Sequence, residues 1–371
     1  MREATVGPMR FFGLIAAVLV MAPGIASASL SQTQVDEIVQ PAIQMGSCKA
    51  IAVGVLDAQG RAVFGYGAID SHGTKPDGQT VFEIGSITKT FTATLLAQMV
   101  LSGEVKLDEP VKDLLPADVK VPAKDGRAIT LLDLATQRSA LPRLPVSFDP
   151  ADWTNPYADY TPQKLYADLA MIQLAQMPGE KYEYSNLGVG LLGHALSLRA
   201  GKSYENLIVD RICTPLGMSH TRITLDAAMR AKLAPGHDWV GQEAKNWDID
   251  ALAGAGAIRS TADDMLIYLA ANLNLTETPL WSAMRMTHER RAGVDDHTDI
   301  GLAWHIARRT GTRWHDGGTG GYSSYAAFVP GRNVAVVVLS NSSNPIVDRL
   351  GIQLVKAELG EKIEALPTTR P

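Results

Sequence analysis

The alternation of hydrophobic and polar positions places the strands of this chain near its two ends. Apolar and alternating runs predict two strands at residues 50–57 and 61–67, joined by the short connection Ala58-Gln59-Gly60. Strand character returns only near the other end, at residues 301–308, 322–329 and 333–340. Apolar positions spaced three to four residues apart predict one further helix outside each group of strands, at residues 32–45 and 345–359.

The long middle of the chain has the periodicity of helices. After a strand-like run at residues 80–84, connections rich in Pro and Gly separate seven helical stretches. These stretches are residues 88–102, 131–137, 162–176, 187–200, 204–212, 261–273 and 279–286.

Strands at both ends of a helical middle predict a mixed α/β (α+β) fold. We expect an antiparallel sheet that is flanked by the two terminal helices and interrupted by an inserted, all-helical domain. The sheet domain would comprise residues 29–84 and 300–365, the helical domain residues 85–299, and a short tail residues 366–371. A ligand cleft is expected between the two domains.

The first residues have the pattern of an export signal. Arg2 and Arg10 precede an apolar run at residues 11–22, and the small residues Ala26-Ser27-Ala28 follow it. We expect cleavage after Ala28, which would make residues 1–28 a signal peptide and the protein periplasmic or secreted. Twelve apolar residues are too few to span a bilayer, so a stable membrane span is not expected. The alternative is a buried N-terminal helix.

The composition and charge of the chain limit the kinds of molecule that it can bind. The chain of 371 residues is 46% hydrophobic and 20% charged, as globular proteins are, and its formal net charge is −5. A mildly acidic protein without a basic block is a poor candidate for binding nucleic acid. A disulfide between Cys48 and Cys213 is permitted in an exported protein, but we prefer two small buried side chains. Neither cysteine has metal-ligand spacing, and no metal or cofactor is expected.

Ser86-Ile87-Thr88-Lys89 follows the strand-like run and carries the first candidate chemistry. On a helix, residues three apart share a face, so Lys89 could take the proton of Ser86. Ser86 would then be a nucleophile with its own base, and the positive end of the helix would favour a neutral Lys89. The alternative is a capping serine beside an exposed lysine.

Two further motifs lie downstream. Tyr184-Ser185-Asn186 follows Pro178-Gly179 on a loop that opens a helix, where a side chain can project into a cleft. Tyr204-Glu205-Asn206 has the same spacing but belongs to an amphipathic helical pattern. The third motif, residues 315–321 (His-Asp-Gly-Gly-Thr-Gly-Gly), precedes a strand and by itself would indicate a turn.

The three motifs in this order resemble those of class C β-lactamases and of the penicillin-binding D-alanyl-D-alanine peptidases and esterases of the same superfamily. The resemblance covers residues 50–340, and residues 105–142 are most similar to AmpH-type peptidases. Further matching segments are Leu131-Leu132-Asp133-Leu134, Ser139-Ala140-Leu141-Pro142, Pro215-Leu216-Gly217-Met218, Ser260-Thr261-Ala262-Asp263-Asp264-Met265 and Gly301-Leu302-Ala303-Trp304. The fold it implies is β-lactamase/transpeptidase-like.

The resemblance implies roles for the motif residues. Tyr184 would be a second proton-transfer group whose phenolate the ammonium of Lys89 favours, and Asn186 would bind substrate and accept a hydrogen bond from Lys89. The third motif would line the cleft at a sheet edge, where Gly317 leaves room for the substrate backbone and the N–H of Gly318 is the second oxyanion donor.

Two residues depart from the β-lactamase pattern. His315, assigned to substrate binding, stands where β-lactamases usually carry Lys, which argues against a dedicated β-lactamase. Asp316 stands where Thr is common. Its carboxylate would repel the carboxylate of a D-Ala peptide or a penicillin if it faced the cleft, and the alternative is that it points away from the cleft.

The sequence therefore predicts an exported serine hydrolase that forms an acyl-enzyme on Ser86. The expected activity is that of a D-Ala peptide (peptidoglycan) carboxypeptidase/endopeptidase, with β-lactamase or penicillin-binding activity at the side. A carboxylesterase of the same superfamily, favoured by His315 and Asp316, and a penicillin-binding sensor without turnover are the alternatives. The expected partner is a small peptide, a β-lactam or an ester.

Overall fold

A large antiparallel sheet forms the centre of the molecule. The structure is a computed structural model that describes Met1 and residues 30–366, so the expected signal peptide and most of the expected tail lie outside the described residues. Eight strands pair in the order β2-β1-β14-β13-β12-β11-β10-β9. Their bounds are β1 Ala50–Asp57, β2 Gly60–Gly67, β9 Ala292–Gly293, β10 Thr298–Ile300, β11 His305–Ala307, β12 Arg313–Gly318, β13 Ser323–Val329 and β14 Val334–Ser340.

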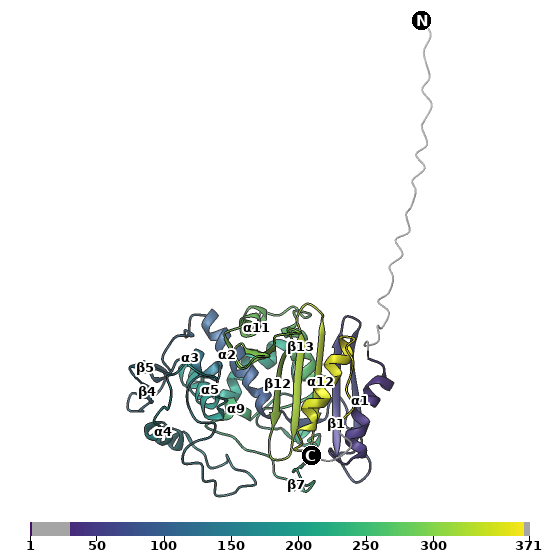
Figure 1. Ribbon diagram of the computed structural model, residues 1–371, viewed down its shortest axis with the longest axis horizontal. Coiled ribbons are helices and arrows are strands. Elements are labelled where there is room, and N and C mark those ends of the chain that lie inside the picture. Colours follow the sequence, from purple (N-terminus) through teal and green to yellow (C-terminus); the bar gives the residue numbers. More distant parts are fainter. Residues whose placement is uncertain (2–29, 367–371) are drawn as a thin grey trace.

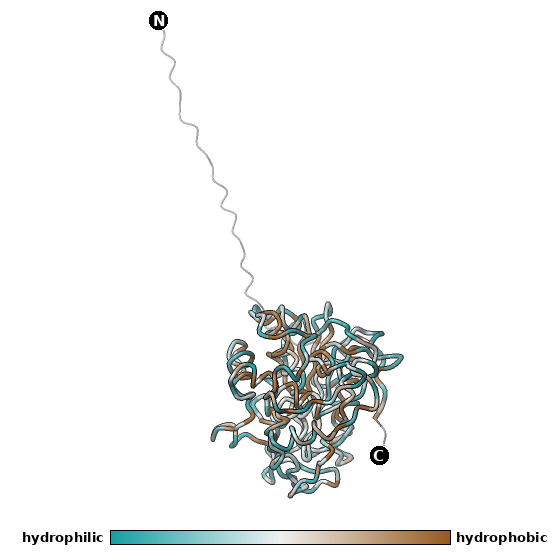
Figure 2. Tube along the Cα trace, turned by 90° about the vertical axis from the view of Figure 1, so that its left-hand side faces the viewer, coloured by the Kyte–Doolittle hydropathy of each residue, from teal (hydrophilic) through white to brown (hydrophobic). Residues whose placement is uncertain are grey.

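Both faces of this sheet are buried, which explains why its central strands are apolar throughout rather than alternating. Ile51 and Val53 of β1 face the terminal helices α1 (Gln32–Gln44) and α12 (Ile346–Glu358), whereas Ala52 between them faces the helical part of the chain. In Figure 1, α12 lies across the sheet, α1 lies beside β1, and the helices of the middle segment lie beyond β12. Figure 2 shows hydrophobic segments gathered inside the molecule. The predicted antiparallel sheet with flanking terminal helices is confirmed.

The helical part is built around α2, a helix that is buried along most of its length, including Lys89 and the threonines of its first two turns. The helices of this part are α2 Thr88–Leu101, α3 Leu131–Ala135, α4 Pro162–Met171, α5 Asn186–Ala200, α6 Tyr204–Ile208, α7 Thr214–Leu216, α8 Ala227–Ala231, α9 Ala253–Gly256, α10 Ala262–Asn272 and α11 Trp281–His288. No helix in the described part of the chain is long and apolar enough to cross a membrane.

Short strand pairs accompany these helices. The expected run at residues 80–84 is β3 (Val81–Glu83), which pairs with β8 (Arg259–Thr261). Two small pairs that the sequence pattern did not indicate are β4 (Ala123–Lys124) with β5 (Arg127–Ala128), and β6 (Gly236–His237) with β7 (Glu243–Ala244).

Several elements differ in extent from the prediction, and the expected helix at residues 162–176 ends already at Met171. Of the expected strand at residues 301–308, only β11 (His305–Ala307) forms, because the chain bends at residues 301–303, where Ala303 has a left-handed backbone (φ 62°). The sequence pattern did not indicate β10, which precedes this bend. The expected helix at residues 204–212 passes from α6 into a π-helical turn, Val209–Cys213. Residues 313–318 form strand β12 of the sheet, in agreement with the position that the resemblance implied for the third motif. The motif alone would indicate a turn, but backbone pairing with β13 offsets the low strand propensity of glycine.

Candidate active site

Ser86 and Lys89 meet at the start of α2. A single 3₁₀ turn, Gly85–Ile87 (η1), carries Ser86 out of β3 and leads directly into the helix. The Lys89 Nζ atom lies 2.9 Å from the Oγ of Ser86, 2.9 Å from the Oδ1 of Asn186 and 2.7 Å from the carbonyl oxygen of Ala255. The structure therefore brings the predicted nucleophile and base into direct contact, and the alternative of an exposed lysine is wrong.

Burial makes the amine of Lys89 a weak base. Its side chain is fully buried, and this burial lowers the pKa of Lys89 to about 7. The positive charge of Arg143 lowers the pKa further, whereas the carboxylate of Asp316 raises it. The expected shift is confirmed in direction, but burial is its main cause. A substantial neutral fraction of Lys89 is available near pH 7 to accept a proton.

The side chain of Tyr184 lies next to both Ser86 and Lys89. The Nζ of Lys89 and the guanidinium carbon of Arg143 each lie 4.9 Å from the centre of the Tyr184 ring. Burial raises the pKa of Tyr184, and the hydrogen bond with Ser86 only partly opposes this shift. The expectation that Lys89 would favour the phenolate is therefore wrong for the unliganded site: Tyr184 is a neutral phenol, which can donate a proton.

The Tyr184 motif is fixed to the segment of residues 137–143. The backbone N–H of Ser185 donates to Gln137 Oε1 (2.7 Å), and its hydroxyl donates to the carbonyl of Pro142 (2.6 Å). The same hydroxyl accepts from the N–H of Gly188 (2.8 Å) and so caps α5. This capping places the side chains on either side of Ser185 at the mouth of the site, as the loop position predicted.

The third motif lies on β12 and packs directly against the turn that carries Ser86. A Cβ atom at Gly317 would lie 2.1 Å from the carbonyl oxygen of Ile84 and 3.0 Å from the backbone nitrogen of Ser86. Such contacts are far shorter than van der Waals distance, so only glycine permits this approach. The structure thus gives a physical reason for Gly317 at this position.

The backbone of Gly318 faces an open strand edge. Thr319 N–H donates to Tyr322 on the β13 side (3.0 Å), and because N–H groups alternate along an antiparallel strand, that of Gly318 points the other way. On that side, β11 pairs only with Arg313 and Trp314. The edge at residues 315–318 is therefore free beside Ser86, where the N–H groups of Ser86 and Gly318 can together bind an oxyanion.

His315 lies behind Tyr184 rather than at the open surface. Its side chain is 1% exposed, its ring centre is 6.3 Å from that of Tyr184, and its Nδ1 atom is 2.6 Å from the carbonyl oxygen of Asp316. Burial and then the charge of Lys89 lower the pKa of His315 to about 3. His315 is thus a neutral imidazole, unlike the lysine that β-lactamases usually carry there.

The side chain of Asp316 points away from the site. Successive side chains on a strand alternate between its faces, and Asp316 lines a cavity beside α12 together with Trp314. Of the two orientations that the sequence left open for Asp316, the structure has the one away from the cleft: the carboxylate lies on the far side of β12.

Arg143 is a functional candidate that the sequence reasoning missed. It lies over the Tyr184 ring and forms no ion pair with a carboxylate in the described part of the chain. One feature of the sequence could have indicated Arg143: it is the sole basic residue between positions 139 and 163. An unpaired guanidinium at the mouth of a cleft can bind a carboxylate.

The wall of the pocket opposite β12 was also missed. Tyr157 and Trp247 line the pocket beside Ser86, and their ring centres are 5.3 Å apart. The carboxylate of Glu83 accepts a hydrogen bond from the backbone N–H of Trp247 (3.0 Å), and the guanidinium of Arg259 donates one to the backbone carbonyl of Trp247 (2.8 Å). The buried ion pair of Glu83 with Arg259 (3.1 Å) therefore positions Trp247.

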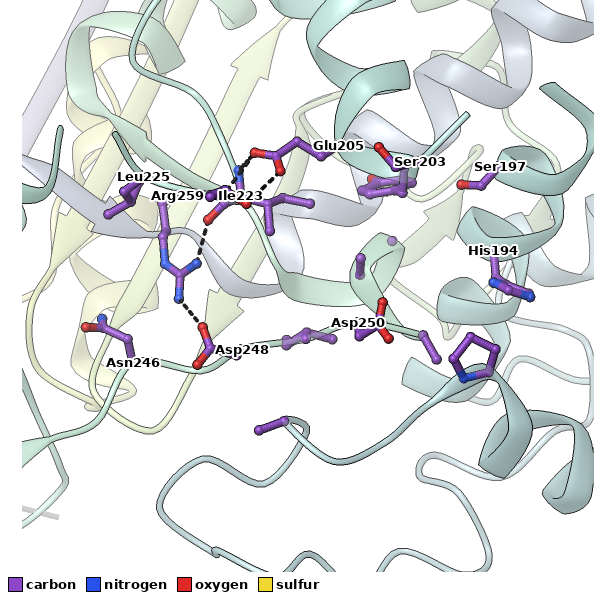
Figure 3. Close-up of a pocket in the computed structure, with 18 of the residues that line it drawn as sticks. His194, Ser197, Ser203, Glu205, Ile223, Leu225, Asn246, Asp248, Asp250 and Arg259 are labelled. Carbon is purple, nitrogen blue, oxygen red and sulfur yellow. Dashed lines mark hydrogen bonds and ion pairs between the residues drawn. The ribbon is translucent and has the colours of Figure 1, made fainter. Parts of the chain in front are cut away.

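A larger cavity of about 700 Å³ adjoins this wall (Figure 3). None of the predicted site residues lines it. Glu205 accepts from the backbone N–H of Ile223 (2.8 Å), and Arg259 donates to the carbonyl of Ile223 (2.6 Å) and lies 3.6 Å from Asp248. These charged groups thus support the local backbone. No cluster of three or more metal-ligating side chains occurs among the described residues.

The fold and the contact of Ser86 with Lys89 and Tyr184 define a serine hydrolase. Comparison with known proteins agrees: the family model described as Beta-lactamase matches residues 35–361. The chain belongs to this beta-lactamase family.

Individual relatives include two kinds of enzyme. A beta-lactamase from Pseudomonas fluorescens is 28% identical over 85% of this chain and 95% of its own length. The D-alanyl-D-alanine-carboxypeptidase/endopeptidase AmpH of Escherichia coli K12 is 29% identical over 79% of each chain. The solved structure of a beta-lactamase/D-alanine carboxypeptidase from Yersinia pestis, complexed with citrate, has a TM-score of 0.74 and 27% identity, covering 89% of this chain and all of the other.

Proposed function

We propose that this serine hydrolase is an exported D-Ala peptidase that forms an acyl-enzyme on Ser86 and is also acylated by β-lactams. The observation that carries the proposal is the contact of Lys89 with Ser86 beneath the neutral phenol of Tyr184, next to the open edge of β12. The relative named D-alanyl-D-alanine-carboxypeptidase/endopeptidase supports a cell-wall peptide as the substrate.

Acylation would proceed in two proton transfers. The neutral amine of Lys89 accepts the hydroxyl proton of Ser86 as Oγ forms a bond to the carbonyl carbon, and the N–H groups of Ser86 and Gly318 stabilise the oxyanion. The carbon–nitrogen bond then breaks, and Tyr184 donates its proton to the leaving amine, its own proton being restored from Lys89. A water molecule releases the acyl group by the same steps in reverse.

Arg143 favours a carboxylate-bearing substrate. D-Ala peptides and penicillins both end in a carboxylate beside the reacting amide, and the unpaired guanidinium over Tyr184 can bind it. Since Asp316 lies on the far face of β12, it does not oppose this binding directly. The carboxylesterase remains a second candidate, because neutral His315 replaces the lysine that usually adds positive charge.

Mass spectrometry of the intact protein tests the proposal. Incubation with penicillin should add one penicilloyl group to Ser86, and incubation with a D-Ala-D-Ala peptide should release D-Ala. Ser86→Ala should abolish both reactions, whereas Ser71→Ala, which changes an exposed serine, should retain them. Hydrolysis of p-nitrophenyl esters without release of D-Ala would instead establish the esterase, and a lasting penicilloyl adduct without release of D-Ala would establish the sensor. In exported material, we expect a mature chain that begins at Ser29.

A further inference from the structure

A second cavity lies on the face of β12 that points away from Ser86. Its volume of about 570 Å³ is in the range of sites for small molecules. Trp314 and Asp316 of β12, Tyr325 of β13 and the side chains of α12 form its walls, and Figure 1 shows α12 lying next to β13. The strand whose free edge adjoins Ser86 thus also forms one wall of this cavity.

The walls are aromatic and aliphatic. The rings of Trp314 and Tyr325 lie nearly parallel, with centres 6.2 Å apart and planes at 14°. Ile352 and Val355 of α12 face them. A Cβ atom at Gly351 would lie only 2.0 Å from the Tyr325 ring, so glycine in α12 makes room for this ring. These surfaces suit the apolar body of a small ligand.

Two carboxylates without partners lie in the same cavity. Neither Asp316 nor Asp348 has a side-chain hydrogen bond or ion pair in the described part of the chain, although both line the cavity. Burial, and then the negative charge of Asp316, raises the pKa of Asp348 to about 7. The hydroxyl of Tyr325, a residue that is 3% exposed, likewise lacks a hydrogen-bond partner there. Both carboxylates are partly exposed, and a partly buried negative charge without a counter-ion favours the binding of a cation.

The cations at the rim of the cavity are already paired. Arg309 forms an ion pair with Glu361 (2.7 Å), and Lys356 forms one with Glu364 (2.8 Å). The two aspartates are therefore the charges left without a counter-ion in this cavity. His297 also lines it.

We propose that this cavity is a second binding site, for a small organic cation with an aromatic or alkyl body. Its ammonium group would lie between Asp316 and Asp348 and donate to the hydroxyl of Tyr325. Its body would pack against Trp314 and the apolar side chains of α12, and the aromatic faces would add attraction for the positive charge.

Binding of a cation at this site would affect the active site through the charge of a single residue, Asp316. The carboxylate of Asp316 raises the pKa of Lys89, so a cation that neutralises Asp316 should lower it. More of the amine would then be neutral below pH 7, and the hydrolase would work at a lower pH. This coupling rests on the proposed role of Lys89 as base, whereas the binding itself does not.

Calorimetric titration with phenethylamine tests the binding, with phenethyl alcohol as the uncharged comparison. We expect the amine to bind and the alcohol to bind at least ~10-fold more weakly, since one lost charge interaction of ~1.4 kcal/mol corresponds to that factor. Asp316→Asn and Asp348→Asn should each weaken binding of the amine by ~10-fold, whereas Asp118→Asn, which changes an exposed aspartate elsewhere, should not. Equal binding of amine and alcohol, or full affinity in both cavity variants, would overturn the proposal.

The coupling has its own readout. With an uncharged ester as substrate, saturating phenethylamine should shift the midpoint of the pH–rate profile toward lower pH, and Asp316→Asn should do so without the amine. Binding without this shift would retain the site and reject the coupling. Absence of any hydrolysis would reject the proposed function, and the calorimetric result would still decide whether the cation site exists.

Discussion

Lys89 is the residue on which the chemistry of this site depends, and two charges from different parts of the chain adjust it. Arg143 lowers its pKa and Asp316 raises it, while burial has the larger effect. The sequence motifs were sufficient to predict Ser86, Lys89, Tyr184 and Asn186 as one cluster. They could not predict the influence of Arg143, because that depends on how a loop packs over Tyr184 and not on spacing along the chain.

Replacement of Arg143 tests recognition of the carboxylate. In Arg143→Gln, we expect the KM for a D-Ala-D-Ala peptide to rise ~10-fold to 100-fold, because a charge-assisted hydrogen bond worth ~1.5–3 kcal/mol is lost. The KM for an uncharged ester should change little. Arg332→Gln, at an exposed arginine outside the site, is the matched control. An unchanged KM for the peptide would exclude Arg143 as the carboxylate receptor.

The Arg143→Gln variant also tests the role of Lys89 as the base. Since Lys89 must be neutral to accept a proton, kcat/KM for an uncharged ester should rise with pH through a midpoint near the Lys89 pKa of about 7. Loss of the positive charge at Arg143 raises that pKa, so the midpoint should move to higher pH, opposite to the shift expected for Asp316→Asn. A pH–rate profile of each variant measures the midpoint. A shift of the Arg143→Gln midpoint to lower pH would contradict the assignment of Lys89 as the base.

Strand β12 is the element that assembles the site, and its position could be predicted from the resemblance but not from the composition of its own residues. Residues 315–318 have the composition of a turn, and they become a strand only because β13 pairs with them. Long apolar elements such as α2 and β14 were predictable because their own residues specify them. The shortening of the expected strand at residues 301–308 to His305–Ala307 depends on the left-handed backbone of Ala303, which local propensity does not reveal.

Gly317→Ala tests the close packing between β12 and the turn that carries Ser86. The added methyl group would lie 2.1 Å from the Ile84 carbonyl, so the strand must move away. We expect the rate of acylation by penicillin to fall ~100-fold or more, because small displacements of reacting groups have effects of that size. The free energy of unfolding should fall by ~1–3 kcal/mol.

Gly331→Ala is the control for this change. A Cβ atom at Gly331 meets open space, although its backbone is left-handed (φ 78°), which costs ~1–2 kcal/mol for other residues. The control should therefore lose similar stability in urea denaturation but keep its acylation rate. Equal acylation rates in both variants would show that β12 tolerates displacement from Ser86.

At the scale of the whole molecule, one sheet separates two hydrophobic clusters, and each cluster contains one cysteine. Cys48 belongs to the cluster under the terminal helices and Cys213 to that of the helical part, and both are free and buried, as the sequence analysis preferred. Because β1 contributes side chains to both clusters, we infer that the two clusters are stable only together.

The two thiols can report on this cooperativity. Burial raises the pKa of Cys48 to about 11 and that of Cys213 to about 12, so neither should react with an alkylating reagent at pH 8 in the folded protein. In pulsed alkylation across a series of guanidinium concentrations, both should become reactive at the same midpoint. Peptide mass spectrometry distinguishes the two sites. Separate midpoints would show that one layer unfolds before the other.

The pairing of β1 with β14 also determines when the molecule can fold. Ile51 lies opposite Ser340, so most of the described chain separates two strands that are neighbours in the sheet. Closing so long a loop has an entropic cost that must be met before any of the contacts form, and proteins dominated by such distant pairings fold slowly. The sheet therefore cannot be completed until β14 has been synthesised, so β1 and β2 remain without their partner strand for most of the time that synthesis takes.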